Sequence, residues 1–168
     1  VVEETEASLA FGLRATLAGV GFMPSQAWLG TDLFKARPDV TTVQDPYSER
    51  SYTAFPALRA NVTVLHAPVA DHAGNARLIG NLALDCELAL ASDLVIVTAE
   101  RTVESLEGPL DLAGAAVDCV VEMPRGAWPT SCYPEYLLDG DELLDYVEAC
   151  STGEFDAYLD RFLERSPE

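Results

Sequence analysis

The chain has 168 residues, a length typical of one domain, and 49% of them are hydrophobic, which is enough to build a core. Twenty-eight acidic residues against ten basic ones give a formal net charge of -18, and such a surface repels nucleic acids and anionic membranes. No apolar run reaches the roughly 18 residues that a membrane helix needs. We therefore expect neither nucleic-acid nor membrane partners.

Lysine and cysteine usage bears on the compartment. Lys35 is the only lysine, which fits either a salt-rich cytoplasm, where salt screens carboxylate repulsion, or a genome that favours arginine over lysine. The four cysteines include no CxxC pair, so we expect reduced thiols in a cytoplasm and neither a disulfide framework nor a zinc site. The chain opens on Val1 and enters a helical pattern at once, which predicts the cut edge of a longer protein.

The first predicted element is a helix near the start of the chain. Its apolar stripe at helical spacing consists of Leu9, Leu13, Leu17 and Val20. Acidic residues precede the stripe and would lie near the positive end of the helix dipole. Gly19, Gly21 and Pro24 end the pattern, and a loop with Gly30 and Pro38 follows.

The middle of the chain indicates strands mixed with a helix. We predict strands over residues 51–55, 62–66, 93–99 and 117–123, an extended segment over 76–79 and a helix over 85–91. Residues 94–97 form a β-rich apolar run of the kind that a parallel sheet buries on both faces. Residues 71–75 predict a turn, in which Gly74 takes a positive φ and Asp71 bonds the backbone ahead of it. The mixture indicates an α/β fold.

Two amphipathic helices are predicted at the end of the chain, over residues 141–150 and 154–163. The residues expected to face inward are Leu143, Leu144 and Val147 on the first helix, and Phe155, Leu159, Phe162 and Leu163 on the second. The acidic residues of both helices are expected to form solvated faces and not a metal site.

Standard catalytic signatures are missing, since the sequence holds no GxSxG, GxxxxGK[ST] or HExxH motif. His66 and His72 are the only histidines, and with no Cys or His cluster around either we predict structural or solvated side chains, not metal ligands. Glu100 and Glu122 each close an apolar strand, where α/β sheets place ligand sites.

Glu3 and Glu6 differ from the other carboxylates because they lie three residues apart, just before the buried stripe of the first helix. A carboxylate partly desolvated at a helix start could serve as acid, base or nucleophile. The competing interpretation is a helix N-terminus stabilised by acidic residues. The residues alone therefore predict a soluble cytosolic α/β domain, part of something larger.

A family resemblance comes from several segments read in order. They are GFMP at 21–24 with LGTDL at 29–33, DPYS at 45–48, FPALR at 55–59 with VLHA at 64–67, AD at 70–71 with GN at 74–75, VIVTAE at 95–100, and VDCVVEMP at 117–124 with GAWPTS at 126–131. Together they resemble the A-type subunits of family I coenzyme A transferases of the glutaconate and 3-oxoadipate type. Two departures are that Trp128 stands where the family has His, and that the family's glycine-rich N-terminal segment has no counterpart.

The resemblance implies a CoA-transferase open α/β sheet flanked by helices, with two C-terminal amphipathic helices, over a single domain at 1–168 that is N-terminally incomplete. It implies a hetero-oligomer with a B-type subunit. The partner's glutamate would attack an acyl-CoA, and CoA would pass through a glutamyl-CoA intermediate to a dicarboxylate or 3-oxo acid. CoA is then a substrate, and no cofactor is permanently bound.

The resemblance also supplies candidate site residues and alternative functions. Glu6 is the one candidate catalytic residue of this chain, and Glu3, Phe22 and Asn75 are candidate substrate-binding residues; no metal ligand is predicted. Relatives of the same architecture hydrolyse cyclic CoA thioesters from steroid rings with a glutamate of their A-type subunit, and Glu3 and Glu6 match the spacing of that motif. A non-catalytic subunit that supplies only an interface is the third possibility.

Overall fold

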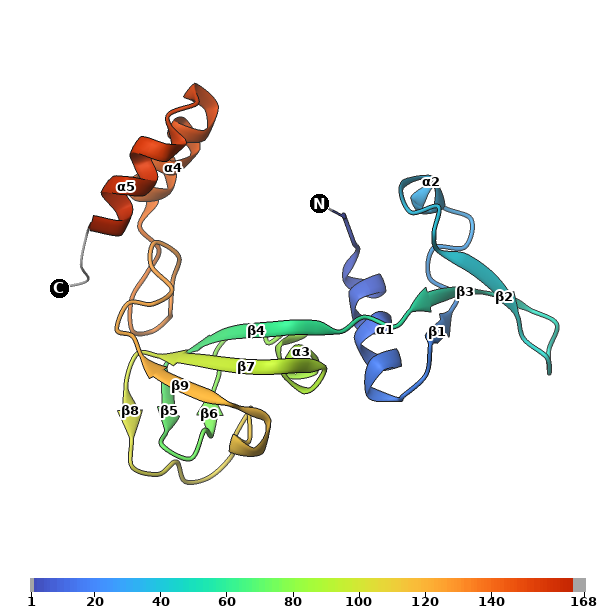
Figure 1. Ribbon diagram of the computed structural model, residues 1–168, viewed down its shortest axis with the longest axis horizontal. Coiled ribbons are helices and arrows are strands. Elements are labelled where there is room, and N and C mark those ends of the chain that lie inside the picture. The colour runs from blue at the N-terminus through green and yellow to red at the C-terminus, as the bar shows by residue number, and fades with distance from the viewer. Residues whose placement is uncertain (1, 165–168) are drawn as a thin grey trace. The chain divides into compact units, whose positions relative to one another are not determined.

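The computed structural model describes residues 2–164 (Figure 1). These residues form two compact units: the first runs to Thr63 and includes Ala83–Val95, and the second comprises Val64–Leu82 and continues from Ile96. That residues 1–168 make one N-terminally incomplete domain stays a prediction. None of the helices in the described part of the chain combines the length and the hydrophobicity needed to cross a bilayer.

The predicted first helix is α1, Glu6–Leu17. Thr5 caps it, because its hydroxyl accepts the Ser8 N–H while the Ser8 hydroxyl accepts the Thr5 N–H, so two backbone donors that would otherwise lack partners are satisfied. On the buried side, a Cβ at Gly12 would lie 2.9 Å from Leu58 Cβ. Glycine therefore lets α1 approach the chain that follows β3.

A three-stranded antiparallel sheet accompanies α1 in the first unit. Its strand order is β1 (Phe22–Ser25), β3 (Ser51–Pro56) and β2 (Thr41–Gln44). β3 confirms the strand predicted at 51–55, whereas β1 and β2 fall in a stretch without a clear periodicity. Pro24 fits in β1 because β1 is an edge strand, where one N–H of the ladder can be missing.

The core of the first unit is aromatic. Trp28, Val40 and Phe55 are buried, and the short helix α2 (Leu33–Ala36) packs against them. The Phe55 ring lies edge-on to Trp28 at 5.0 Å and stacked on Phe11 at 5.4 Å, both favourable aromatic geometries. The predicted helix at 85–91 is α3, Asp85–Leu90, which contacts α1.

The second sheet has the order β4 (Ala60–Ala67), β7 (Ser92–Ala99), β9 (Cys119–Glu122), shown in Figure 1. β7 and β9 run parallel, as the apolar run predicted. The prediction that 94–97 is buried on both faces is wrong: Val95 and Val97 are buried, but Leu94 is 39% exposed. Successive strand residues point to opposite faces, and the described residues cover mainly one of them.

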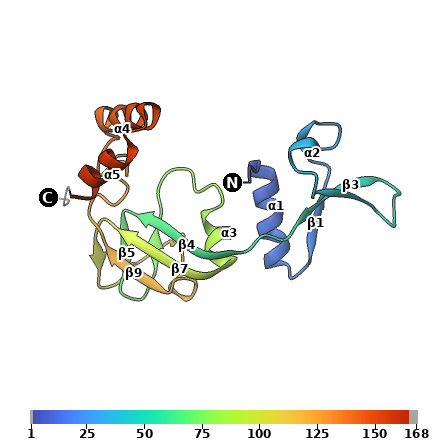
Figure 2. The same ribbon diagram turned by 45° about the horizontal axis from the view of Figure 1, so that its top comes forward.

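A small third sheet, whose strands are labelled in Figure 1 and whose β5 is seen from a second direction in Figure 2, supports the turn at 71–75. It consists of β6 (Ala76–Arg77), β5 (Val69–Asp71) and β8 (Thr102–Val103), with β5 antiparallel to β6 and parallel to β8. Gly74 takes the predicted positive φ, +90°, and packs against Gly114 of the short 3-10 helix Gly114–Ala116. The predicted turn is confirmed.

Both C-terminal helices are present, as α4 (Gly140–Thr152) and α5 (Phe155–Glu164). Tyr146 and Tyr158 meet edge to face at 5.7 Å between them. The predicted inward faces are partly wrong: the exposed residues are Leu144, Val147, Phe155 and Leu163. Two helices in contact bury only a narrow stripe, and here aromatic rings and Ala149 fill it, so the rest of each apolar face stays open in the described chain.

Candidate functional site

The most heavily bonded group of side chains lies where β4 and β7 end. His66 Nε2 lies 2.6 Å from Glu100 Oε1, and His66 Nδ1 lies 2.9 Å from Thr98 Oγ1. His66 and Glu100 are 15% and 10% exposed. Because a carboxylate only accepts, Nε2 carries a proton, and in the neutral ring Nδ1 accepts from the Thr98 hydroxyl.

The segment after β9 completes the bonding of Glu100. Its Oε2 accepts the Arg125 N–H at 2.7 Å, and its Oε1 accepts the Tyr136 hydroxyl at 2.8 Å. Burial alone would raise the pKa of Glu100, but the donors from Arg125, Tyr136 and His66 outweigh it and lower the pKa below its ordinary value. Burial, and then the bond to Glu100, raise the pKa of Tyr136 to about 12.

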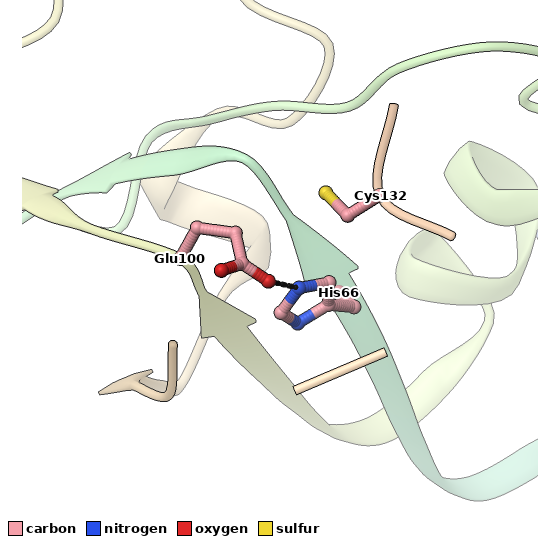
Figure 3. A group of neighbouring side chains, drawn as sticks. All are labelled: His66, Glu100 and Cys132. Carbon is pink, nitrogen blue, oxygen red and sulfur yellow. Dashed lines mark hydrogen bonds and ion pairs between the residues drawn. The ribbon is translucent and has the colours of Figure 1, made fainter. Parts of the chain in front are cut away.

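Gly126 and Cys132 lie against the His66–Glu100 pair. A Cβ at Gly126 would be 2.8 Å from His66 Cε1, so only glycine lets the backbone pass the imidazole. Cys132 is 4% exposed, and its Sγ, His66 and Glu100 each place a ligand-type atom within 4.8 Å of the others (Figure 3). Burial raises the pKa of the Cys132 thiol, and the nearby Glu100 adds to the effect.

The chemistry of this cluster follows from its partners. Both ring nitrogens of His66 and both oxygens of Glu100 are bonded within the chain. Each of these four atoms thus has a hydrogen-bond partner, which fixes the orientation of both side chains within the chain. The cluster, which we term the His66–Glu100 clamp (His66, Thr98, Glu100, Tyr136), fixes the segment from Arg125 to Tyr136 onto the strand ends.

Asn75, a predicted substrate-binding residue, belongs to a second network. Asp71 is 1% exposed; its Oδ1 accepts the N–H groups of Ala73 and Asn75, and its Oδ2 accepts Asn75 Nδ2 and the Leu106 N–H. Asn75 Oδ1 accepts the Gly114 N–H. These bonds, with Asn75 first, lower the pKa of Asp71. The amide of Asn75 thus braces the turn, and its substrate contact stays a prediction.

The other predicted site residues lie in the first unit. Glu6 is the first residue of α1 and is exposed, and Glu3 is exposed beside a surface hollow of about 430 Å³ lined by Val2, Ala36, Arg37 and Asp39. The partial desolvation expected of Glu6 is not found in this chain. Phe22 begins β1 and is 42% exposed. The structure does not join Phe22, Glu3 and Glu6 by any described bond.

Glu122, the other carboxylate predicted at a strand end, is bonded to Thr102. Its Oε2 accepts the Thr102 N–H at 2.7 Å and also the Thr102 hydroxyl, which lowers the pKa of Glu122. Together with His72, Asp118 and Gly74, Glu122 lines an open hollow of about 430 Å³. The hollow is wide and acidic, and it could accept a cation or a hydrogen-bond donor more readily than an anion.

Trp128, one of the two departures from the resemblance, has a structural role in this chain. Its ring stacks on Phe162 of α5 at 5.3 Å and 7°, and its Nε1 donates to Asp139 Oδ2 at 3.2 Å. Asp139 is the N-cap of α4 and accepts the Glu142 N–H. Trp128 therefore ties the loop after β9 to both terminal helices, and the indole is used for packing.

Sequence reasoning identified Glu100 but missed the residues that bond it. Tyr136 and Arg125, which bond Glu100, lie 36 and 25 residues away along the chain, and the neighbouring Cys132 lies 32 residues away, so local spacing carries no sign of them. The VTAE pattern at 97–100 gives one usable signal. Thr98 and Glu100 are two residues apart, so in extended chain both side chains lie on the same face, at the carboxyl end of β7.

Comparison with solved structures defines the class of protein. A variant of the decarboxylase AibA/AibB matches with a TM-score of 0.87 and 32% identity, over 97% of this chain and 61% of that one. The glutaconate coenzyme A-transferase of Acidaminococcus fermentans matches with a TM-score of 0.75 at 24% identity, over 94% of this chain and 61% of that one. The chain thus has the α/β fold of the CoA-transferases, as predicted.

Sequence relatives include A-type subunits of two kinds of enzyme. The A-type subunit of the 3-oxoadipate CoA-transferase of Pseudomonas knackmussii is 34% identical over 140 residues, 82% of this chain and 50% of the relative. The IpdA subunit of the cholesterol ring-cleaving hydrolase of Rhodococcus jostii is 32% identical over 166 residues, 90% of this chain and 56% of the relative. Over most of its own length the chain is thus similar to A-type subunits of CoA-transferases and of a related hydrolase. It spans about half the length of these relatives, and no family model matches it.

Proposed function

We propose that the chain is part of the A-type subunit of a heteromeric CoA-transferase that moves CoA between an acyl-CoA and a dicarboxylate or 3-oxo acid. The observation that carries the proposal is the 34% identity to the A-type subunit of a 3-oxoadipate CoA-transferase over 82% of the chain. The bonding of His66 and Glu100 agrees with it, because hydrogen bonds within the chain give both side chains a structural role. Under this proposal the attacking carboxylate belongs to a B-type partner.

The proposed mechanism is a ping-pong reaction in which CoA is a substrate and not a resident cofactor. A glutamate of the partner attacks the acyl-CoA carbonyl, and the C–S bond breaks to give an acyl-glutamyl anhydride and CoA thiolate. The thiolate attacks the glutamyl carbonyl and releases the carboxylate product, which leaves a glutamyl-CoA thioester. The acceptor acid takes CoA by the reverse steps. Glu3, Phe22 and Asn75 are proposed as substrate-binding residues.

A second candidate function is hydrolysis of a cyclic CoA thioester, with Glu6 as the catalytic carboxylate. Two observations favour it: the 32% identity to a ring-cleaving hydrolase subunit, and the position of Glu6 as an exposed first residue of α1. There Glu6 could take a proton from water as the water attacks a ring carbonyl. The carboxylate would become more basic if a partner or substrate covered it.

The decisive experiment is an assay of the intact protein with its co-purified partner. Under the transfer proposal, acyl-CoA and a free acid exchange CoA, and intact mass spectrometry finds CoA bound covalently to a glutamate of the partner. Glu6→Gln should then leave the covalent intermediate in place. If the wild-type protein instead releases a ring-opened CoA product and Glu6→Gln abolishes that turnover, the reaction is hydrolysis. The control variant is Glu104→Gln, at an exposed position.

A purely structural role for this chain is the third outcome of the same assay. Activity that is unchanged by substitution of Glu6, Glu3, Phe22 and Asn75 together would establish a subunit that supplies only an interface. We propose a cytoplasmic location, supported by the four free cysteines at positions 86, 119, 132 and 150.

A further inference from the structure

A third side chain of metal-ligand type, the thiol of Cys132, lies beside the His66–Glu100 clamp. Cys132 Sγ lies with a nitrogen of His66 and a carboxylate oxygen of Glu100 so that all three atoms are within 4.8 Å of one another. The three residues come from β4, the end of β7 and the loop after β9, and Figure 3 shows them gathered from these separate segments. One sulfur, one imidazole nitrogen and one carboxylate form a donor set that suits a borderline cation such as Zn²⁺.

Hydrogen-bond partners hold two of these side chains, His66 and Glu100, from behind. A metal-bound histidine generally donates its other N–H to an oxygen, and His66 Nδ1 faces Thr98 Oγ1 at 2.9 Å. The Thr98 hydroxyl has a second acceptor, Leu65 O, at 3.4 Å, to which it can turn when Nδ1 becomes the donor. Arg125 N–H and the Tyr136 hydroxyl hold the carboxylate of Glu100.

We propose that His66, Glu100 and Cys132 bind one divalent transition-metal ion, with Zn²⁺ as the class of ion that fits, and with water in the fourth position. Binding requires the His66–Glu100 contact of 2.6 Å to open by about 0.7–1.0 Å, since ligands about 2.0–2.3 Å from Zn²⁺ lie about 3.3–3.6 Å apart in a tetrahedron. The sulfur, which lies within 4.8 Å of both other ligand atoms, must also reach about 2.3 Å from the ion. Both shifts are within the reach of side-chain rotation.

The proton balance of binding is defined. The thiol of Cys132 loses its proton to solvent as the metal–sulfur bond forms. The proton of neutral His66 moves from Nε2 to Nδ1, so the ring releases none. With one thiolate and one carboxylate, the site is neutral around a 2+ ion, and about one proton is released for each ion bound.

The inferred site departs from the prediction that the chain has no metal ligand. Sequence spacing could not show it, because 34 residues separate His66 from Glu100 and 32 separate Glu100 from Cys132. The inference does not depend on the proposed CoA transfer. A bound ion would replace the hydrogen bond between His66 and Glu100, and it would link β4, β7 and the loop after β9.

Cobalt provides the test, because Co²⁺ bound to thiolate has a charge-transfer absorption that Co²⁺ bound to oxygen and nitrogen alone lacks. We expect the intact reduced protein to bind one Co²⁺ with this band, and Zn²⁺ to displace it. Cys132→Ser should remove the band and weaken binding by at least about 100-fold. Thr98→Val should weaken binding by about 10-fold or more while the band remains.

The matched control is Cys119→Ser combined with Cys150→Ser, since both of these thiols are exposed. Retention of the band in this control supports the site, and its loss overturns it in favour of adventitious surface binding. If Cys132→Ser does not fold, X-ray absorption of the zinc-loaded wild-type protein decides: one sulfur at about 2.3 Å supports the site, and nitrogen and oxygen ligands alone overturn it. Absence of stoichiometric binding also overturns it.

Discussion

The imidazole of His66 and the carboxylate of Glu100 are joined by a 2.6 Å hydrogen bond across 34 residues of sequence. Each group is bonded on its other side as well, His66 to Thr98 and Glu100 to Arg125 and Tyr136. The pair therefore connects two strand ends with the loop that follows a third strand. Its stability can be tested without knowing the reaction.

Removal of one hydroxyl should weaken the clamp. The Tyr136 hydroxyl oxygen accepts the Ala127 N–H at 3.0 Å, and its hydrogen is donated to Glu100. Tyr136→Phe removes both hydrogen bonds. We expect a loss of about 1–2 kcal/mol in the free energy of unfolding, measured by urea denaturation. Tyr133→Phe, at a side chain that is 66% exposed, is the control and should change little. Equal effects of the two variants would contradict the role of the clamp.

Adding one methyl group beside His66 should have a comparable effect. Gly126→Ala places a Cβ 2.8 Å from His66 Cε1 and 2.9 Å from the Met123 carbonyl oxygen. The ring or the loop must shift, at a cost of about 1–3 kcal/mol in unfolding free energy. Gly21→Ala meets no atom within 4 Å and should be neutral or slightly stabilising. A wild-type denaturation midpoint for Gly126→Ala would show that the loop does not pass the imidazole closely.

The turn at 71–75 should make the fold sensitive to acid. Hydrogen bonds, first that from Asn75, lower the pKa of Asp71 in the folded chain. A carboxyl group with a lower folded pKa stabilises the fold above its unfolded pKa, about 3.9, and loses this contribution as the pH falls through the folded value. Asp71→Asn should therefore be less stable than wild type at pH 7, with the difference shrinking below about pH 4.

Urea denaturation of both proteins from pH 7 to pH 2.5 measures this difference. Asp160→Asn, on the exposed face of α5, is the control and should track the wild type at every pH. A stability gap between Asp71→Asn and wild type that does not change with pH would show that the turn does not depend on an ionised Asp71.

The contacts of Trp128 predict how the terminal helices are anchored. Trp128→Leu removes the stack on Phe162 and the bond from Nε1 to Asp139. We expect faster hydrogen exchange in α4 and α5, with a loss of about 1–3 kcal/mol in local stability. Leu163→Ala, at a side chain that is 71% exposed, should leave exchange unchanged. Unchanged exchange in Trp128→Leu would show that the helices hold themselves in place.

Local patterns predicted most of the elements of the fold. The apolar stripe of α1, the strands β3, β4, β7 and β9, and both terminal helices follow from periodicity within one segment. β1 and β2 escaped because neither contains a run of apolar β-formers such as the one that includes β9, and β1 contains a proline. The exposure of Leu144 and Val147 depends on what else packs on α4, which a local stripe cannot specify.

The candidate site was less accessible to sequence reasoning. Asp71 and Gly74 were predicted in their observed roles because a turn is a local structure. The partners of Glu100 could not be found, since a loop 25 to 36 residues away delivers them. The family resemblance supplied the fold and the candidate residues Glu3, Glu6, Phe22 and Asn75, whose roles stay predictions.

The hydroxyl oxygen of Thr5 has a consequence for the proposed role of Glu6. The oxygen that accepts the Ser8 N–H at the start of α1 also accepts Trp28 Nε1–H at 3.1 Å, and Trp28 lies in the aromatic core. An indole 22 positions after Glu6 in the sequence thus bonds the cap residue that immediately precedes Glu6. A substitution at Trp28 should therefore change how firmly the first turn of α1 is held, and with it the position of Glu6, while Glu6 itself stays unchanged.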